Sequence, residues 1–165
     1  MPRLNATRTA QYPLHQEFVF THNSWVVDSA DGAKKTFGST VAASTDPTEA
    51  ALNGPAANTI TFDCMPMPAG AVIIGGSLIV ETAVTGSTAY TVSLGIAGTL
   101  TGLLNAVSAL SAARTALTLT TPLVANAGQN LRATVAYTVA NATAGRIRLR
   151  VEYTIDNRAV ENAGA

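Results

Sequence analysis

Apolar and polar residues alternate along residues 146–155. The apolar positions are Ile147, Leu149, Val151, Tyr153 and Ile155, and the positions between them are Arg146, Arg148, Arg150, Glu152 and Thr154. Successive side chains of a strand point to opposite faces of a sheet, whereas a helix would scatter the same apolar groups around its axis. The segment therefore predicts a strand with one buried face and one charged face in water.

Residues 129–139 alternate in the same way. The apolar side chains on one face of this second strand are Leu131, Ala133, Val135 and Tyr137. Further short strands are predicted at 16–28, 36–42, 59–63, 71–83, 89–96 and 115–120. Many short strands separated by turns are typical of an antiparallel sandwich or barrel. The two alternating strands, joined by a turn at 141–145, are expected to form a hairpin.

Two stretches depart from a plain strand pattern. Residues 97–114 fit a helical face as well as a loop. The apolar positions that suggest the helical face are Leu103, Leu104, Val107 and Leu110. Gly75 and Gly76 fall inside the predicted strand 71–83, and glycines there indicate a bulge or a close backbone approach.

The N-terminal part of the chain is less regular. Residues 1–15 contain Pro2 and Pro13 and show no periodicity, which predicts an extended arm. Residues 44–58 form a long polar loop that is either flexible or ordered by a partner. The expected divisions are an extended N-terminal arm at 1–15, an N-terminal strand and long loop region at 16–58, and a β-sandwich core at 59–165.

The composition bears on partners. Hydrophobic residues make up 47% of the 165 residues and charged residues only 12%, about half the usual charged share. Either partners cover much of the surface, or small residues with Ser and Thr line the wet faces. Ten residues of each sign give no bulk attraction to nucleic acid or to a membrane. The sequence has no apolar run long enough to span a membrane and no apolar signal core near Met1, so export is not expected.

Groups that carry catalysis are scarce. His15 and His22 are the two histidines, and neither has metal-ligand spacing around it. Cys64 is the single cysteine and is expected to be a small buried hydrophobe. Glu81 and Glu152 are expected to pair with arginines on a wet face rather than to act as an acid and a base. We therefore predict no enzymatic activity, no bound metal and no cofactor.

Arg146, Arg148 and Arg150 share one face of their predicted strand, with Arg132 expected beside them on the neighbouring strand. One interpretation is a solvated face whose charge is balanced by the strand glutamates. The other is a docking face for an acidic protein surface. Nucleic acid is disfavoured because aromatic stacking partners are missing there.

Several segments carry a family resemblance. They read Met-Pro-Ala-Gly-Ala-Val-Ile-Ile-Gly-Gly at 67–76, Val-Glu-Thr-Ala at 80–83, Arg-Thr-Ala-Leu at 114–117 and Thr-Ala-Gly-Arg-Ile-Arg-Leu-Arg-Val-Glu-Tyr at 143–153, followed by Arg158-Ala159. In these segments the chain resembles the small β-sandwich decoration, or cement, proteins of tailed-phage (bacteriophage) capsids.

The resemblance implies an all-β, jelly-roll-like antiparallel β-sandwich without enzymatic activity. It implies a protein made in the host cytoplasm that assembles as a homotrimer, or a dimer, on the outer capsid surface of the virion. There it would clamp neighbouring subunits of the major capsid protein and so stabilise the capsid. The candidate capsid-binding residues are Arg3, Arg8, Tyr12 and His15 in the arm, and Arg146, Arg148 and Arg150 on the strand.

Two other functions stay open at this point. The first is another virion structural sandwich, such as a head-fibre base or a tail-associated part. The second is a carbohydrate-binding module, which usually presents exposed aromatic platforms beside polar groups. The chain has only Trp25 with four Tyr and four Phe, and most of these fall at expected core positions.

Overall fold

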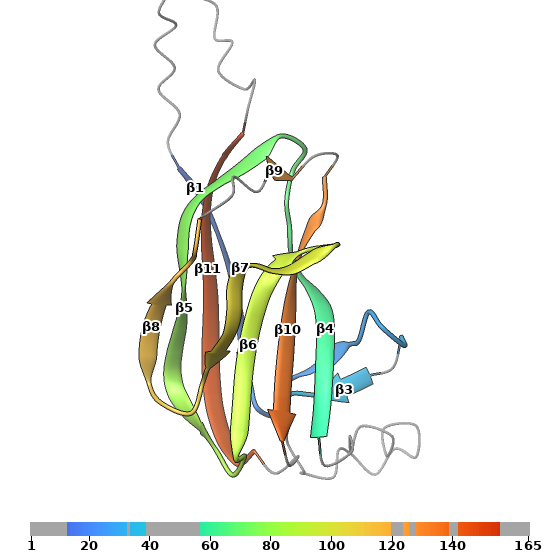
Figure 1. Ribbon diagram of the computed structural model, residues 1–165, viewed down its shortest axis with the longest axis vertical. Helices are drawn as coiled ribbons and strands as arrows, with labels where there is room; N and C mark the ends of the chain where they lie inside the picture. The colour runs from blue at the N-terminus through green and yellow to red at the C-terminus, as the bar shows by residue number, and fades with distance from the viewer. Residues whose placement is uncertain are drawn as a thin grey trace, which may run out of the picture.

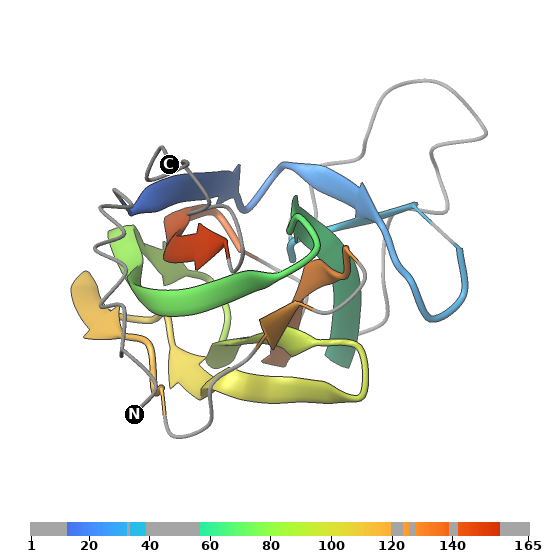
Figure 2. The same cartoon turned by 90° about the horizontal axis from the view of Figure 1, so that it is seen from above.

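The computed structural model describes residues 13–32, 34–38, 57–119, 124–125, 128–138 and 142–155. Within these ranges the chain forms strands and turns without a helix. Two antiparallel sheets face each other, and a short two-stranded ribbon lies beside them (Figure 1; Figure 2). The predicted all-β antiparallel sandwich is confirmed, whereas the jelly-roll-like character and the extended arm stay predictions.

The first sheet has the strand order β1-β11-β5-β8, with β9 also paired to β5. Its strands are β1 (Leu14–Thr21), β5 (Ala71–Thr85), β8 (Ala113–Ala116), β9 (Val124–Ala125) and β11 (Ala144–Ile155). The second sheet has the order β4-β10-β6-β7. Its strands are β4 (Ala57–Pro66), β6 (Ala89–Ile96), β7 (Thr99–Ser108) and β10 (Asn130–Thr138). The ribbon pairs β2 (Trp25–Val27) with β3 (Lys34–Thr36).

The core lies between the two sheets and follows from the alternation. In β11, Ile147, Leu149, Val151 and Tyr153 are buried, as predicted. In β10, the buried set is Leu131, Ala133, Val135 and Tyr137. An aromatic cluster adjoins them, in which the ring centroid of Phe20 lies 4.5 Å from Phe37 and that of Phe37 lies 5.1 Å from Phe62.

The prediction that the last two long strands, β10 and β11, form a hairpin is wrong. β10 lies in the second sheet between β4 and β6, whereas β11 lies in the first sheet between β1 and β5. Their apolar faces therefore meet across the core instead of sharing one face of a sheet. Arg132 consequently sits away from the β11 arginines and pairs with Asp63 of β4, with 2.7 Å between Arg132 Nε and Asp63 Oδ1.

Residues 97–114 contain no helix, and most of them form β7, an edge strand paired with β6, while 109–112 connect it to β8. The pairing shifts register on both sides of Leu94, which lies opposite Leu104. Leu103 and Leu104 are both buried, although adjacent strand residues normally face opposite ways. This irregularity hides the two-residue period from the sequence.

The N-terminal prediction needs two corrections. The expected strand 16–28 is divided by a turn, in which the N–H of Ser24 bonds to the carbonyl of Thr21 at 3.1 Å. β1 begins at Leu14, inside the expected arm, and pairs along its whole length with β11. The sandwich therefore includes a strand from before residue 59. Of the expected strand 36–42, only Thr36 belongs to β3, and residues 39–42 lie outside the described ranges.

The Gly75-Gly76 pair makes the predicted close approach. Gly76 has φ +141°, and a Cβ there would overlap the carbonyl oxygen of Arg150 and the Leu117 side chain. The β11–β5 pairing also shifts register nearby, between Glu152 and Tyr153. The glycine pair thus lets β5 pass closely along β11.

Candidate functional site

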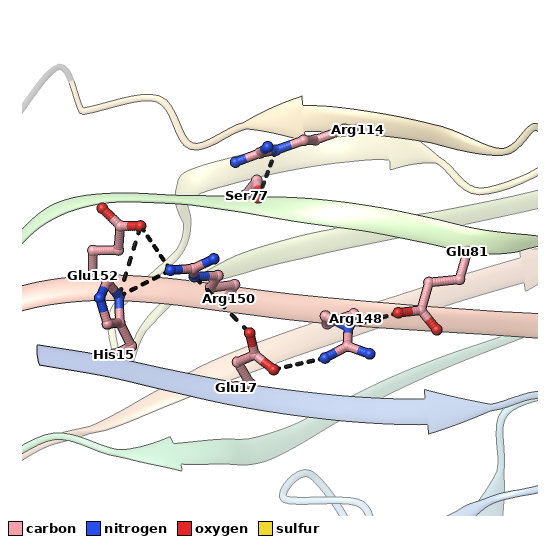
Figure 3. A network of polar contacts seen from close by, with 8 residues as sticks. All are labelled: His15, Glu17, Ser77, Glu81, Arg114, Arg148, Arg150 and Glu152. Carbon is pink, nitrogen blue, oxygen red and sulfur yellow. Dashed lines mark hydrogen bonds and ion pairs between the residues drawn. The ribbon is translucent and has the colours of Figure 1, made fainter.

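The outer face of the first sheet carries a ladder of charged side chains, shown in Figure 3. The pairing of β1 with β11 sets His15 opposite Glu152 and Glu17 opposite Arg150. The alternation that buries one face of each strand leaves these groups on the other face. The arginines expected to share a wet face do so.

Glutamates on both flanking strands pair with the β11 arginines. Glu81 of β5 accepts from Arg146 Nε at 2.5 Å and from Arg148 Nε at 2.6 Å. Arg148 Nη1 also donates to Glu17 of β1 at 2.7 Å. Hydrogen bonds from Arg148 and Arg146 lower the pKa of Glu81 below its ordinary value. Glu81 is therefore ionised at neutral pH.

Arg150 has weaker partners at the other end of the ladder. Its Nη2 lies 3.4 Å from Glu152 Oε1, and its Nε lies 3.9 Å from Glu17 Oε1. His15 Nδ1 lies 3.7 Å from the same Glu152 oxygen, a contact that is an ion pair only when His15 is protonated.

The ladder is close to neutral overall. Four arginines, the three of β11 and Arg114 of β8, face three glutamates, which leaves one positive charge in excess. Arg114 Nε donates to Ser77 Oγ at 3.2 Å and has no carboxylate partner among the described residues. The geometry fits the solvated, internally balanced face. Docking on an acidic surface stays a prediction.

The other sequence-predicted site residues are only partly placed. His15 lies on β1 within the ladder. Arg3, Arg8 and Tyr12 lie outside the described residues, so their expected role in binding stays a prediction.

The described residues offer little to catalysis. Burial raises the pKa of the Cys64 thiol to about 12, and its S–H donates to the Leu131 carbonyl at 3.3 Å, so the thiol is protonated at neutral pH. No group of three His, Cys, Asp or Glu side chains that could hold a metal ion occurs in the described part of the chain. The same part contains no helix long and apolar enough to cross a membrane.

Sequence reasoning missed a second surface, on the β2–β3 ribbon. Trp25 and Val27 remain 57% and 48% exposed, and Lys34 Nζ lies 4.6 Å from the centroid of the Trp25 ring. We call these three residues the Trp25 patch. The sequence contains a signal for this ribbon. The turn-like run from Asp28 to Gly32 separates Trp25-Val26-Val27 from Lys34-Lys35-Thr36, and two short runs around a turn are the pattern of a hairpin.

A buried carboxylate fixes the ribbon against the sandwich. Asp28 is 1% exposed and accepts bonds from the N–H groups of Ala30 and Thr61, at 3.0 and 3.2 Å. Lys35 Nζ lies 2.6 Å from the second oxygen of Asp28 and 2.7 Å from Asp31. Burial raises the pKa of Asp28, but the bonds from Lys35, Ala30 and Thr61 outweigh it, and the net pKa is lowered. Asp28 is therefore an ionised, fully partnered anchor.

Comparison with known proteins gives one informative likeness. No protein-family model matches the chain. No curated protein matches it. Among solved structures, the chain is similar to one described as "Cyanophage Pam1 capsid asymmetric unit". The TM-score is 0.51 and the identity 18%, over 94% of this chain and 99% of that chain. At this identity, the likeness shows a shared fold.

Proposed function

We propose that this chain is a structural protein of a virion and, more closely, a capsid decoration protein. The observation that carries the proposal is the fold likeness to a chain from a cyanophage capsid, which extends over nearly the full length of both chains. The segments that resemble capsid decoration proteins add independent support, because most of their residues lie on β5, β8 and β11 of the same sheet. The low charged share of 12% is consistent with a surface covered by partners.

In the finer form of the proposal, the chain binds the outer capsid surface as a homotrimer and clamps neighbouring subunits of the major capsid protein. A dimer is the alternative assembly. Clamping requires two contacts on each chain or a symmetric assembly that presents one contact several times.

Co-sedimentation with undecorated capsids tests the proposal. The full chain should pellet with capsids at a saturable stoichiometry, and light scattering on free protein should give the mass of a trimer. A variant lacking residues 1–12 keeps all of β1 and isolates the contribution of the arm. Weakened binding with an unchanged circular dichroism spectrum supports the arm as a contact. A full chain that stays in the supernatant at every concentration overturns the proposal.

A carbohydrate-binding module is the competing function with a physical observation in its favour, the exposed Trp25. Lys34, however, already occupies one face of the Trp25 ring. A sugar ring stacking on that face would have to displace the cation. The geometry therefore favours a protein partner.

A further inference from the structure

We propose that the Trp25 patch is a docking site for a protein surface that presents an apolar pocket edged by a carboxylate. The inference rests on the proposed function, so the partner is the major capsid protein of the shell.

The patch leaves two large apolar side chains about half exposed, Trp25 and Val27. Figure 2 shows the β2–β3 ribbon extending from the side of the sandwich. In the ribbon, Val27 lies opposite Lys34, and Trp25 lies diagonally next to Lys34. Tryptophan dominates binding energy at protein interfaces because it buries a large area with few rotatable bonds. The ribbon thus presents one aromatic anchor with an aliphatic neighbour.

Several contacts fix the ribbon against the sandwich. Beyond the Asp28 anchor, the Phe37 N–H donates to the Ser24 carbonyl at 3.2 Å, and the Tyr90 hydroxyl donates to the Phe37 carbonyl at 3.1 Å. The Phe37 ring is buried in the aromatic cluster. Preorganisation of this kind strengthens binding by reducing the entropy lost on association.

The charge of Lys34 indicates which chemical group the partner should present. Lys35 on the same strand is paired with Asp28 and Asp31, whereas Lys34 has no ion-pair partner among the described residues. The charged ladder on the outer face is largely neutralised by its own glutamates. The Lys34 ammonium lies over the Trp25 ring and has no carboxylate partner among the described residues, so it favours a partner with a carboxylate next to an apolar pocket.

The test compares four chains in the capsid co-sedimentation assay: wild type, Trp25→Ala, Lys34→Glu and Ile74→Ala. Ile74 is 43% exposed on β5 and serves as the matched apolar truncation outside the ribbon. We expect Trp25→Ala to weaken capsid binding at least tenfold and Lys34→Glu to weaken it severalfold. Ile74→Ala should bind as wild type does. Circular dichroism and the urea midpoint check that each variant is folded.

The outcomes separate the inference from the function it rests on. If wild type, Trp25→Ala and Lys34→Glu all bind capsids with the same affinity, the inference about the Trp25 patch is overturned and the proposed function stands. Wild type that does not bind overturns both. Loss of the free protein's oligomeric state in Trp25→Ala assigns the patch to a second copy of this chain and overturns the capsid contact. Because Trp25 is the single tryptophan, a change in its fluorescence with soluble glucans would assign the patch to a sugar and likewise overturn the inference.

Discussion

Asp28 accepts a hydrogen bond from the backbone N–H of Thr61, with 3.2 Å between nitrogen and Oδ1. Thr61 lies on β4, an edge strand of the second sheet. Its carbonyl in turn accepts from the Ser29 N–H at 2.6 Å. The ribbon thus occupies backbone groups on an edge that would otherwise be open to another strand, and covering such groups limits edge-to-edge association.

Removing the Asp28 carboxylate should destabilise the protein. Asp28→Ala leaves the Thr61 N–H and Lys35 without this buried acceptor, and we expect a loss of roughly 1.5–3 kcal/mol in the free energy of unfolding. Urea denaturation measures the loss. Asp31→Ala is the matched control, since the Asp31 side chain is 50% exposed and such pairs contribute about 0–1 kcal/mol. Equal effects of the two substitutions would contradict the anchoring role.

Stability should fall as the pH drops through the acidic range. The net pKa of Asp28 is lowered, and the pKa of Asp63 is lowered by hydrogen bonds from Asn130 and Arg132. A group with a lowered folded-state pKa contributes stability that is present above its unfolded value, about 4, and is lost as the pH falls through the folded value. Urea midpoints between neutral pH and about pH 3 should show this decline, with a shallower slope in Asp28→Asn. A parallel slope in that variant would exclude Asp28 as a source of the effect.

Alanine should be tolerated very differently at two glycines with positive φ. Gly98 has φ +88° and open space around a Cβ, so Gly98→Ala should cost about 1–2 kcal/mol from backbone strain alone. At Gly76 the added Cβ meets the Arg150 carbonyl and Leu117 as well, and overpacking adds roughly 1–3 kcal/mol. Thermal unfolding of both variants compares the two costs. Similar midpoints would show that the β5–β11 approach is not as tight as the geometry indicates.

Glu81→Gln tests the predicted docking role of the arginines. The substitution removes the carboxylate shared by Arg146 and Arg148 without removing any arginine. If these arginines contact an acidic capsid surface, binding to capsids should tighten at low salt and become more salt-dependent. The measurement is co-sedimentation over a salt series. Unchanged affinity at every salt concentration would show that the ladder is only a solvated face.

The two-residue period of apolar residues predicted much of the fold. It predicted the inward residues of β10 and β11, and the bounds expected for 89–96 match β6. It could not assign strands to sheets, because alternation tells which face of a strand is buried and not which strand lies beside it. This is why β10 and β11 were expected to form a hairpin and Arg132 was expected beside Arg146.

Local irregularities account for the other differences. Leu103 and Leu104 are both buried at a register shift, so β7 lacks the alternation that would identify it. At the candidate site, the alternation in β11 predicted the shared face of its three arginines, and Glu81 and Glu152 were expected to balance them. The pairing of Glu17 was not predicted, because it depends on β1 lying beside β11. The exposure of Trp25 was not predictable in this way, because residues 16–28 have the pattern of one core strand. Only the turn between Thr21 and Ser24 separates Trp25 from β1.

A cryo-EM map of the assembled particle tests the central claim most directly. The proposed function predicts density for this β-sandwich on the outer surface of the shell, in contact with more than one major capsid subunit. The further inference predicts that the Trp25 patch faces the shell. A map of a particle containing the chain that shows it in the tail, or shows no such density on the capsid, would contradict the account.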